Sequence, residues 1–363
     1  RLRTRQRRRE QSGSLTASTQ SSFRCPSCYR FGVTVPRPNL FDFATSELSQ
    51  DAVLGWCLAW ADGRYATSDP ALNEIGRDLI SSLFRAASID APAEPYSVVV
   101  ARQIEHVDIV AELGTEHLLV IEDKVHTSEH SDQLKTYAEA LAELYPERKR
   151  AFIFLKTGDQ SSYVGVKADG WTTFLRQDLL AVLRRGSNCT NAIFRDFLDV
   201  IERREGAVQG FRTAPVTTWD RRDPAYVGLF AELQTQFEDG RWGYVPNPSG
   251  GFLGFWWNFE EVEGGEIYLQ IEEDALMVKV WVEDADRRGE LRELWFRRVV
   301  DSIPGFVRPR RFGNGEYMTV ATRGDYRVQG PDGRLDVDAT ICALRKVTAA
   351  LSRLAGAAPL ATK

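Results

Sequence analysis

The stretch that most constrains this chain is VDIVAELGTEHLLVIEDKVHTSEHSDQLKTY, residues 107–137. It contains two runs rich in Val, Ile and Leu, 107–113 and 118–124, on either side of Gly114-Thr115, a pair typical of a turn. We expect these runs to form two antiparallel strands. The apolar residues that follow recur at helical spacing, which predicts an amphipathic helix over 131–144.

Charged residues stand at the ends of these two strands. Asp108 lies near the start of the first strand, and Glu122 and Lys124 end the second. Glu122 and Lys124 are two residues apart and therefore share a face of the strand, whereas Asp123 points to the other face. Charges are costly in a half-buried sheet unless they act together. Binding a divalent metal ion is the simplest shared task for them.

This set of residues fits the hydrolysis of a phosphodiester bond. That reaction needs stabilised charge on the phosphate, an aimed water molecule and a stabilised leaving oxygen. Mg²⁺ takes one or two carboxylates together with water, so we expect Asp108 and Glu122 as ligands, with the backbone carbonyl of Asp123 as a further one. Lys124 is expected to hold the attacking water or to help deprotonate it. A surface ion-pair cluster without chemistry is the alternative interpretation.

The segments around this stretch complete an α/β pattern. Helices are expected over 47–61, from Asp69-Pro70 onward, and over 171–183 and 191–203, and strands are expected over 96–104 and 151–157. Ser46 is a plausible N-cap for the first helix, whose apolar face would carry Leu48, Ala52 and Trp56. The expected order is helix, strand, strand, strand, helix, strand, followed by further helices.

At this point the residues carry a family resemblance. Asp108, followed fourteen residues later by the IEDK run with Glu122 and Lys124, resembles the PD-(D/E)XK nuclease superfamily. The order of elements is similar to that superfamily's restriction-endonuclease-like core, αβββαβ, which implies a mixed sheet flanked by helices. Gln133 and Tyr137 form a QxxxY pattern similar to that of the exonuclease-like branch.

The opening FDFATSELSQDAVLGWCLAWAD also looks like the start of a bacterial group of this superfamily. It places Glu47 in the first core helix, where many members have an additional acid. Val107 stands where the nominal motif has proline, which is a common departure.

The resemblance implies a metal-dependent nuclease, with Mg²⁺ usual and Mn²⁺ as a substitute. It also implies DNA as the substrate, in restriction, defence or repair, with RNA left open. Glu47 would then reach the metal through water, and Gln133 and Tyr137 would orient Lys124 or contact the phosphate strand. The structural alternatives are a helix-dipole role for Glu47, a core position for Tyr137 and a solvated Gln133. The alternative function is a nucleic-acid-binding or defence-complex subunit with little or no cleavage.

Three parts of the chain are expected. Residues 1–36 form a basic, disordered tail, residues 39–205 form the nuclease-like domain, and residues 219–356 form an α+β domain of uncertain role. In this last part helices are expected over 226–237, 290–303 and 338–354, and strands over 251–259, 266–273, 275–283, 317–322 and 326–328. It also holds arginines interleaved with aromatic residues, which fit a nucleic-acid backbone surface or a solvated charged face: Arg297, Arg298, Arg308, Arg310 and Arg311.

Composition sets the remaining bounds. The chain has no apolar run of about 18 residues, so no membrane span is expected, and its five scattered cysteines do not form a disulfide framework. We therefore expect a cytoplasmic protein. The first 36 residues carry eight arginines and one glutamate, a net charge of +7. Because the whole chain carries −5, the remaining residues carry −12. In such an acidic body any phosphate-binding surface must be local.

Two possible zinc motifs are incomplete. Cys25 and Cys28 form half of a zinc site, but no second Cys/His pair stands at partner spacing. His126 and His130 are four residues apart, and no third ligand is evident. Spare thiols and solvated or substrate-side histidines are the favoured interpretations.

Overall fold

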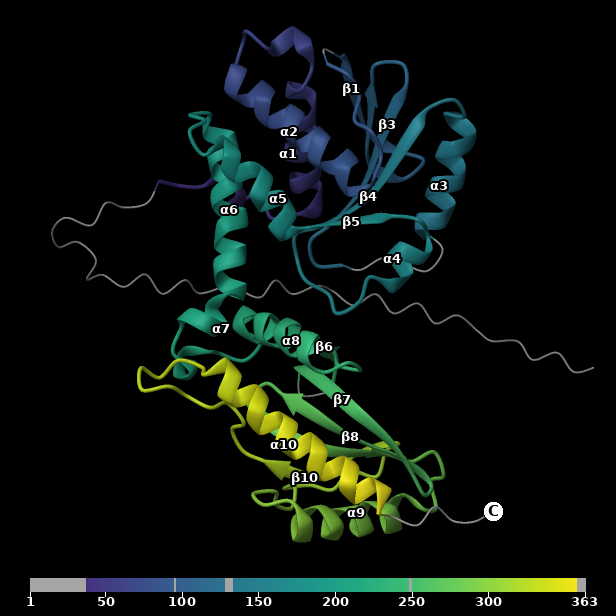
Figure 1. Ribbon diagram of the computed structural model, residues 1–363, viewed down its shortest axis with the longest axis vertical. Helices are drawn as coiled ribbons and strands as arrows, with labels where there is room; N and C mark the ends of the chain where they lie inside the picture. Colours follow the sequence, from purple (N-terminus) through teal and green to yellow (C-terminus); the bar gives the residue numbers. More distant parts are fainter. Residues whose placement is uncertain (1–36, 95, 128–132, 248–249, 358–363) are drawn as a thin grey trace, which may run out of the picture. The chain divides into compact units, whose positions relative to one another are not determined.

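The computed structural model describes residues 37–94, 96–127, 133–247 and 250–357. The predicted disordered tail and its Cys25/Cys28 pair lie outside the described residues. From residue 39 onward, the described residues group into one compact unit. It contains two five-stranded sheets, one after the other along the chain (Figure 1).

The first sheet is mixed, as predicted. Its strands follow one another in sequence order: β1 (Val98–Ile104), β2 (Val107–Leu113), β3 (His117–Lys124), β4 (Lys149–Lys156) and β5 (Thr172–Leu175). The first three strands pair antiparallel, and β3–β4 and β4–β5 pair parallel. Gly114 adopts a φ of +56° in the turn between β2 and β3, a left-handed conformation that suits glycine.

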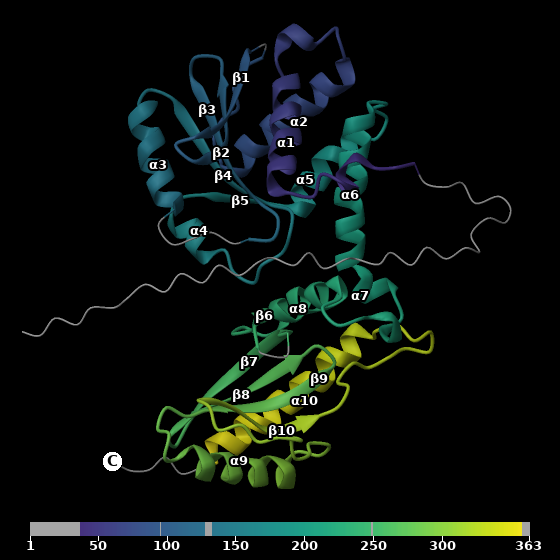
Figure 2. The same ribbon diagram turned by 180° about the vertical axis from the view of Figure 1, so that it is seen from behind.

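Helices cover both faces of this sheet, as the two opposite views show (Figures 1 and 2). One face packs against α1 (Glu47–Trp60), α2 (Pro70–Ala86), α5 (Arg176–Leu183) and α6 (Ala192–Val208). The other face packs against α3 (Gln133–Leu144) and α4 (Val164–Ala168). Strand β3 is consequently buried along nearly its whole length, which explains its almost continuous apolar sequence. The charged residues at its end are therefore exceptional.

Two expectations for this region were wrong. The segment predicted as a helix over 171–183 begins as strand β5, and α5 starts only at Arg176. The β-branched and aromatic residues of TTFL complete the sheet beside β4, with Ile153 paired to Thr172. In α1 the predicted apolar face is displaced, because Leu48 is 56% exposed and Ala52 is also exposed. The helix instead buries Gln50, Asp51, Val53, Leu54, Gly55, Cys57 and Leu58.

The second sheet is antiparallel throughout. Its strands are β6 (Arg241–Val245), β7 (Phe252–Val262), β8 (Gly265–Glu272), β9 (Ala275–Trp281) and β10 (Tyr317–Arg323), in the order β10-β9-β8-β7-β6. The apolar face shares a core with helices α8 (Pro224–Gln236), α9 (Arg288–Ser302) and α10 (Val337–Gly356) and with Phe211 of the short α7 (Gly210–Thr213). This confirms a second, C-terminal sheet with aromatic-rich antiparallel strands. The strand expected over 326–328 does not form. The backbone N–H of Val328 donates to Thr340 Oγ1 and its carbonyl accepts from the N–H of Asp336, so these groups do not pair with a strand.

Short 3-10 turns complete the described chain: η1 (Leu40–Asp42), η2 (Gly63–Tyr65), η3 (Arg184–Gly186) and η4 (Val216–Thr218). Helix α6 continues past the expected boundary at residue 205, so the domain limits 39–205 and 219–356 stay predictions. Among the described helices, none is both long and apolar enough to cross a membrane.

Candidate active site

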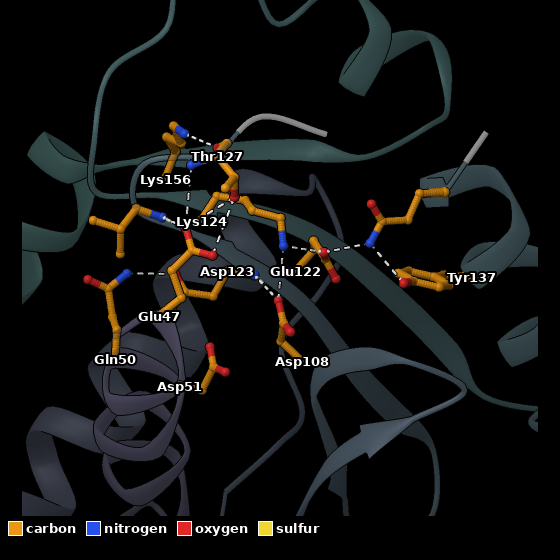
Figure 3. Close-up of polar contacts among 12 residues, drawn as sticks. Glu47, Gln50, Asp51, Asp108, Glu122, Asp123, Lys124, Thr127, Tyr137 and Lys156 are labelled. Carbon is orange, nitrogen blue, oxygen red and sulfur yellow. Dashed lines mark hydrogen bonds and ion pairs between the residues drawn. The ribbon is translucent and has the colours of Figure 1, made fainter. Parts of the chain in front are cut away.

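Three of the sequence-predicted residues meet at the end of β3 (Figure 3). The pairing of Ile109 with Ile121 brings the start of β2 beside the end of β3. Lys124 Nζ lies 2.5 Å from Glu122 Oε1 and 3.5 Å from Asp108 Oδ2. The backbone N–H of Asp123 donates to Asp108 Oδ2 at 2.9 Å. The two acids and the lysine therefore form one contiguous group.

Glu122 is the most constrained of the three. Its side chain is 1% exposed. Oε1 accepts hydrogen bonds from Lys124 at 2.5 Å and from Gln133 at 3.0 Å, while Oε2 has no hydrogen-bond partner among the described residues. Burial, and then the charge of Asp108, raises the pKa of Glu122 to about 7 against the opposing effect of Lys124. A buried acceptor without a donor is costly, and a bound cation would satisfy it.

Lys124 carries the positive charge of this group. Burial by itself lowers the pKa of a lysine, but the hydrogen bond to Glu122 and the charges of Glu122 and Asp108 outweigh it and raise the pKa of Lys124. The side chain is therefore an ammonium group, which donates hydrogen bonds and does not accept protons. Of the two expected roles, holding the attacking water suits it better than deprotonating that water.

Gln133 and Tyr137 lie one turn apart on α3 and face the same point. Gln133 Nε2 donates to Tyr137 Oη at 2.8 Å as well as to Glu122. In the described structure the pair therefore orients Glu122 and does not contact Lys124 directly. Contact with a phosphate strand stays a prediction.

Glu47 holds the loop that follows β3. Its Oε1 accepts from the backbone N–H of Val125 at 2.7 Å and of His126 at 3.1 Å, and from Thr127 Oγ1 at 3.1 Å. Burial raises the pKa of Glu47, but these hydrogen bonds outweigh it and lower the pKa overall. Lys156, buried at the end of β4, donates from Nζ to the carbonyl of Thr127. The loop is thus held by Glu47 on one side and by Lys156 on the other. The water-mediated contact of Glu47 with a metal ion stays a prediction.

Sequence reasoning missed a second group of polar residues on the opposite face of β3. Gln50 Nε2 donates to Asp123 Oδ1 at 2.7 Å, and Asp51 lies one helical turn beyond Glu47. Asp51 and Asp123 are each 1% exposed. Burial, and then neighbouring carboxylates, raises the pKa of both. The sequence feature that could have indicated this group is the polar pair Gln50-Asp51 within the apolar run of the first helix.

The arginines expected to contact nucleic acid belong to the second region, on α9 and in the segment that follows it. Arg297 and Arg308 both approach Glu293, and the Arg308 guanidinium lies 4.3 Å from the ring centroid of Phe312. Arg298 lies over Trp295, and Arg310 and Arg311 are exposed. Among the described residues, no hydrogen bond or ion pair links these arginines to the site on β3, so their role stays a prediction.

A known protein family matches the part of the chain that contains this site. Residues 38–216 match the family model described as the PD-(D/E)XK nuclease superfamily. This segment is a PD-(D/E)XK superfamily domain. Searches of curated proteins and of solved structures returned no significant match. The superfamily domain supports a nuclease-type function, and a nucleic acid as substrate, for this chain.

PD-(D/E)XK nucleases generally use divalent metal ions. The residues at the end of β3 should therefore include ligands for such an ion. Within the described ranges, no group of three or more His, Cys, Asp or Glu residues is placed to hold a metal. Mg²⁺ binds through one or two carboxylates and keeps several waters. The pair Asp108 and Glu122, with Glu122 Oε2 unpartnered, meets that lower requirement. Of the two histidines considered for zinc, His126 is exposed and His130 lies outside the described residues.

Proposed function

We propose that this protein is a Mg²⁺-dependent nuclease that hydrolyses DNA phosphodiester bonds at the end of β3. Asp108 and Glu122 are the proposed metal ligands, together with the backbone carbonyl of Asp123, and Mn²⁺ is an expected substitute. The observation that carries the proposal is Glu122, a buried carboxylate that bonds Lys124 and Gln133 through one oxygen and leaves the other without a partner.

The proposed roles follow from the side chains present. When bound, the metal ion supplies positive charge to the phosphate and lowers the pKa of a bound water. The Lys124 ammonium orients the attacking water and stabilises the negative charge that develops on the phosphate. Gln133, backed by Tyr137, keeps Glu122 Oε1 in place. Glu47 and Lys156 fix the loop after Lys124 and so hold the end of the strand.

The substrate and setting are part of the proposal. DNA is preferred over RNA on the resemblance of the sequence to enzymes of restriction, defence and repair. Cys57, Cys189 and Cys342 are free thiols, which supports a reducing compartment such as the cytoplasm. The exposed arginines of α9 and the segment after it are proposed to contact the nucleic-acid backbone.

A cleavage assay across substrates tests the proposal. Supercoiled plasmid, linear duplex DNA, single-stranded DNA and single-stranded RNA are incubated with the protein in Mg²⁺, in Mn²⁺ and in EDTA. DNA cleavage is expected only with metal, and Asp108→Ala and Lys124→Ala should each reduce the rate by at least about 100-fold. Lys149→Ala, which removes an exposed lysine from the opposite end of the same sheet, is the matched control.

Cleavage that persists in EDTA, or that both variants retain, would contradict the proposed site. Binding of DNA without cleavage under every condition would favour the alternative function, a nucleic-acid-binding or defence-complex subunit. Cleavage of RNA alone would leave the site in place and correct the substrate.

A further inference from the structure

A pocket of about 310 Å³ lies at the carboxyl ends of the parallel strands β3 and β4. Its floor is the two loops that leave these strands, with Val125 following Lys124 and Gly158 following the end of β4. A Cβ atom at Gly158 would lie 1.9 Å from the Val125 carbonyl oxygen, so only glycine fits where the loops touch. The two loops therefore touch at the floor, which stands at the sheet edge where open α/β sheets bind their ligands.

Three arginines and one acidic residue line this pocket. Arg176 is neutralised by Asp159, at 2.5 Å, and by Glu205, at 2.8 Å. Arg204 and Arg222 form no ion pair with any carboxylate of the described chain. The three arginines, with Asp159 and Glu205, therefore carry a net charge of +1, in a chain whose total charge is −5. This is a local positive site in an acidic body.

Arg204 is the charge that most needs a partner. Its Nη1 donates to two neutral groups, Gln50 Oε1 and Thr157 Oγ1, each at 2.9 Å. Burial lowers the pKa of Arg204 despite the attraction of Asp123. Because Gln50 also holds Asp123, this arginine is tied through one side chain to the residue between Glu122 and Lys124. An anion bound in the pocket would supply the missing counter-charge.

The remaining wall of the pocket is apolar. It comes from the end of α6 and the start of α8 and consists of Ala207, Val208, Pro224 and Val227. A Cβ atom at Gly228 would lie 2.1 Å from the Val208 carbonyl oxygen, so α8 packs closely against the end of α6. An apolar wall beside two arginines suits a ligand with an apolar part and an anionic part.

We propose that this arginine pocket binds one nucleotide of the substrate strand, with the phosphate on Arg204 and Arg222 and the base on the apolar wall. The inference rests on the proposed function, because it takes the ligand to be the strand that the neighbouring site cleaves. Its volume is at the lower end of the range of about 300–1,000 Å³ for small-molecule sites. That size fits a single nucleotide and excludes a duplex.

Binding measured without metal tests the pocket independently of cleavage. Fluorescence anisotropy of a labelled twelve-nucleotide single-stranded DNA is measured in EDTA. Arg222→Ala should weaken binding about 10-fold, since a charged contact to phosphate is lost. Ala207→Phe should weaken it by a similar factor, because it fills the pocket from an exposed helix position and leaves every charge in place. Arg222 is preferred over Arg204 for this test because Arg204 also supports Gln50.

Matched controls remove neighbouring arginines that do not line the pocket. Arg221 adjoins Arg222 and pairs with Glu273, and Arg203 adjoins Arg204 and pairs with Asp42 and Asp199. Arg221→Ala and Arg203→Ala should change the affinity by less than about 3-fold. An equal loss in pocket and control variants would overturn the proposal, since it would show a general charge effect.

Competition separates the strand from a free nucleotide. Thymidine monophosphate should displace the labelled strand from the unaltered protein better than inorganic phosphate does. If thymidine monophosphate binds but never displaces the strand, the pocket serves a free nucleotide and the proposal fails. Strand binding through the pocket without any cleavage would support the pocket and refute the nuclease function. Cleavage with an unchanged KM in Arg222→Ala and Ala207→Phe would refute the pocket and keep that function.

Discussion

Charged side chains lie in both sheets: buried at the end of β3 in the first, and half-buried on β8 and β9 in the second. In the second sheet, Glu272 and Lys279 face one another with 3.9 Å between the carboxylate oxygen and Nζ. Gln270 donates to Glu272 at 2.7 Å and Lys279 donates to Thr319 at 3.2 Å. Burial raises the pKa of Glu272 and lowers that of Lys279, each against the attraction of its partner. One acid is balanced by one base.

The end of β3 lacks this balance. Four carboxyl groups gather there: Asp108 and Glu122 beside the ammonium group of Lys124, and Asp51 and Asp123 on the opposite face of β3. Of these four, Lys124 forms ion pairs with Asp108 and Glu122 alone. Arg102 approaches Asp51 only at 3.4 Å and from the surface. A matched pair needs nothing further, whereas an excess of buried acid lowers stability until a cation binds. The comparison therefore separates charge that supports a fold from charge that is available to a ligand.

The largest effect is expected from Glu122→Gln, measured without metal. Because the pKa of Glu122 is raised from 4.5 to about 7, the folded wild-type protein keeps a proton that the unfolded chain has lost. Its stability therefore falls as the pH rises through this window, and a glutamine removes that loss. The variant's advantage in free energy of unfolding should widen by about 3 kcal/mol between pH 4 and pH 8.

Urea unfolding in EDTA at both pH values measures this difference, with Glu272→Gln as the comparison in the second sheet. An advantage that does not change with pH would show that Glu122 is not strained by excess charge. Saturating Mg²⁺ should stabilise the wild-type protein and leave the variant unaffected, because the variant lacks a proposed ligand.

The matched pair should behave in the opposite way. Lys279→Ala leaves Glu272 half-buried without its base, and we expect it to lower the free energy of unfolding by about 2 to 3 kcal/mol. The double variant Lys279→Met with Glu272→Leu should recover most of that loss, since it removes both charges and keeps the volume. Thermal and urea unfolding check both. A double variant less stable than Lys279→Ala would mean that the pair contributes more than charge balance.

A smaller effect is expected at Asp62, an acid of the first region that has donors in excess. Its carboxylate accepts from the side chain and backbone N–H of Arg64 and from the backbone N–H of Val98 at 2.8 Å. The Arg64 side chain first, and the backbone donors with it, lower the pKa of Asp62 from 3.8 to about 2. The stability that Asp62 contributes is present above pH 3.8 and is lost as the pH falls toward 2.

Asp62→Asn should therefore cost about 1 to 2 kcal/mol at pH 7, and the cost should shrink between pH 4 and pH 2. Urea titrations of the variant and the wild-type protein across that range test it. A cost that stays constant down to pH 2 would show that Asp62 acts through shape and not through its charge.

Some of these residues could be placed from the sequence and others could not, because some positions are set by local geometry and others by tertiary packing. Lys124 and Glu122 were predictable because strand alternation is local and fixes their shared face. Asp51 and Gln50 were not, because their burial depends on where α1 meets the end of β3, and Leu48 is exposed for the same reason. Strand β5 was misread as helix because TTFL becomes a strand only beside the free edge of β4. Arg204 could not be placed at all, since its partner Gln50 is 154 residues away.

That long separation has a consequence for the order in which the protein is made. The proposed active-site residues Asp108, Glu122 and Lys124 leave the ribosome within one hairpin of the chain. The hydrogen bond from Arg204 that secures Gln50, and through it Asp123, closes only after α6 has been synthesised. At about 5–20 residues per second, the 80 residues between Lys124 and Arg204 take about 4 to 16 seconds. A growing chain therefore contains the proposed active-site residues for several seconds before it contains the arginine that supports them.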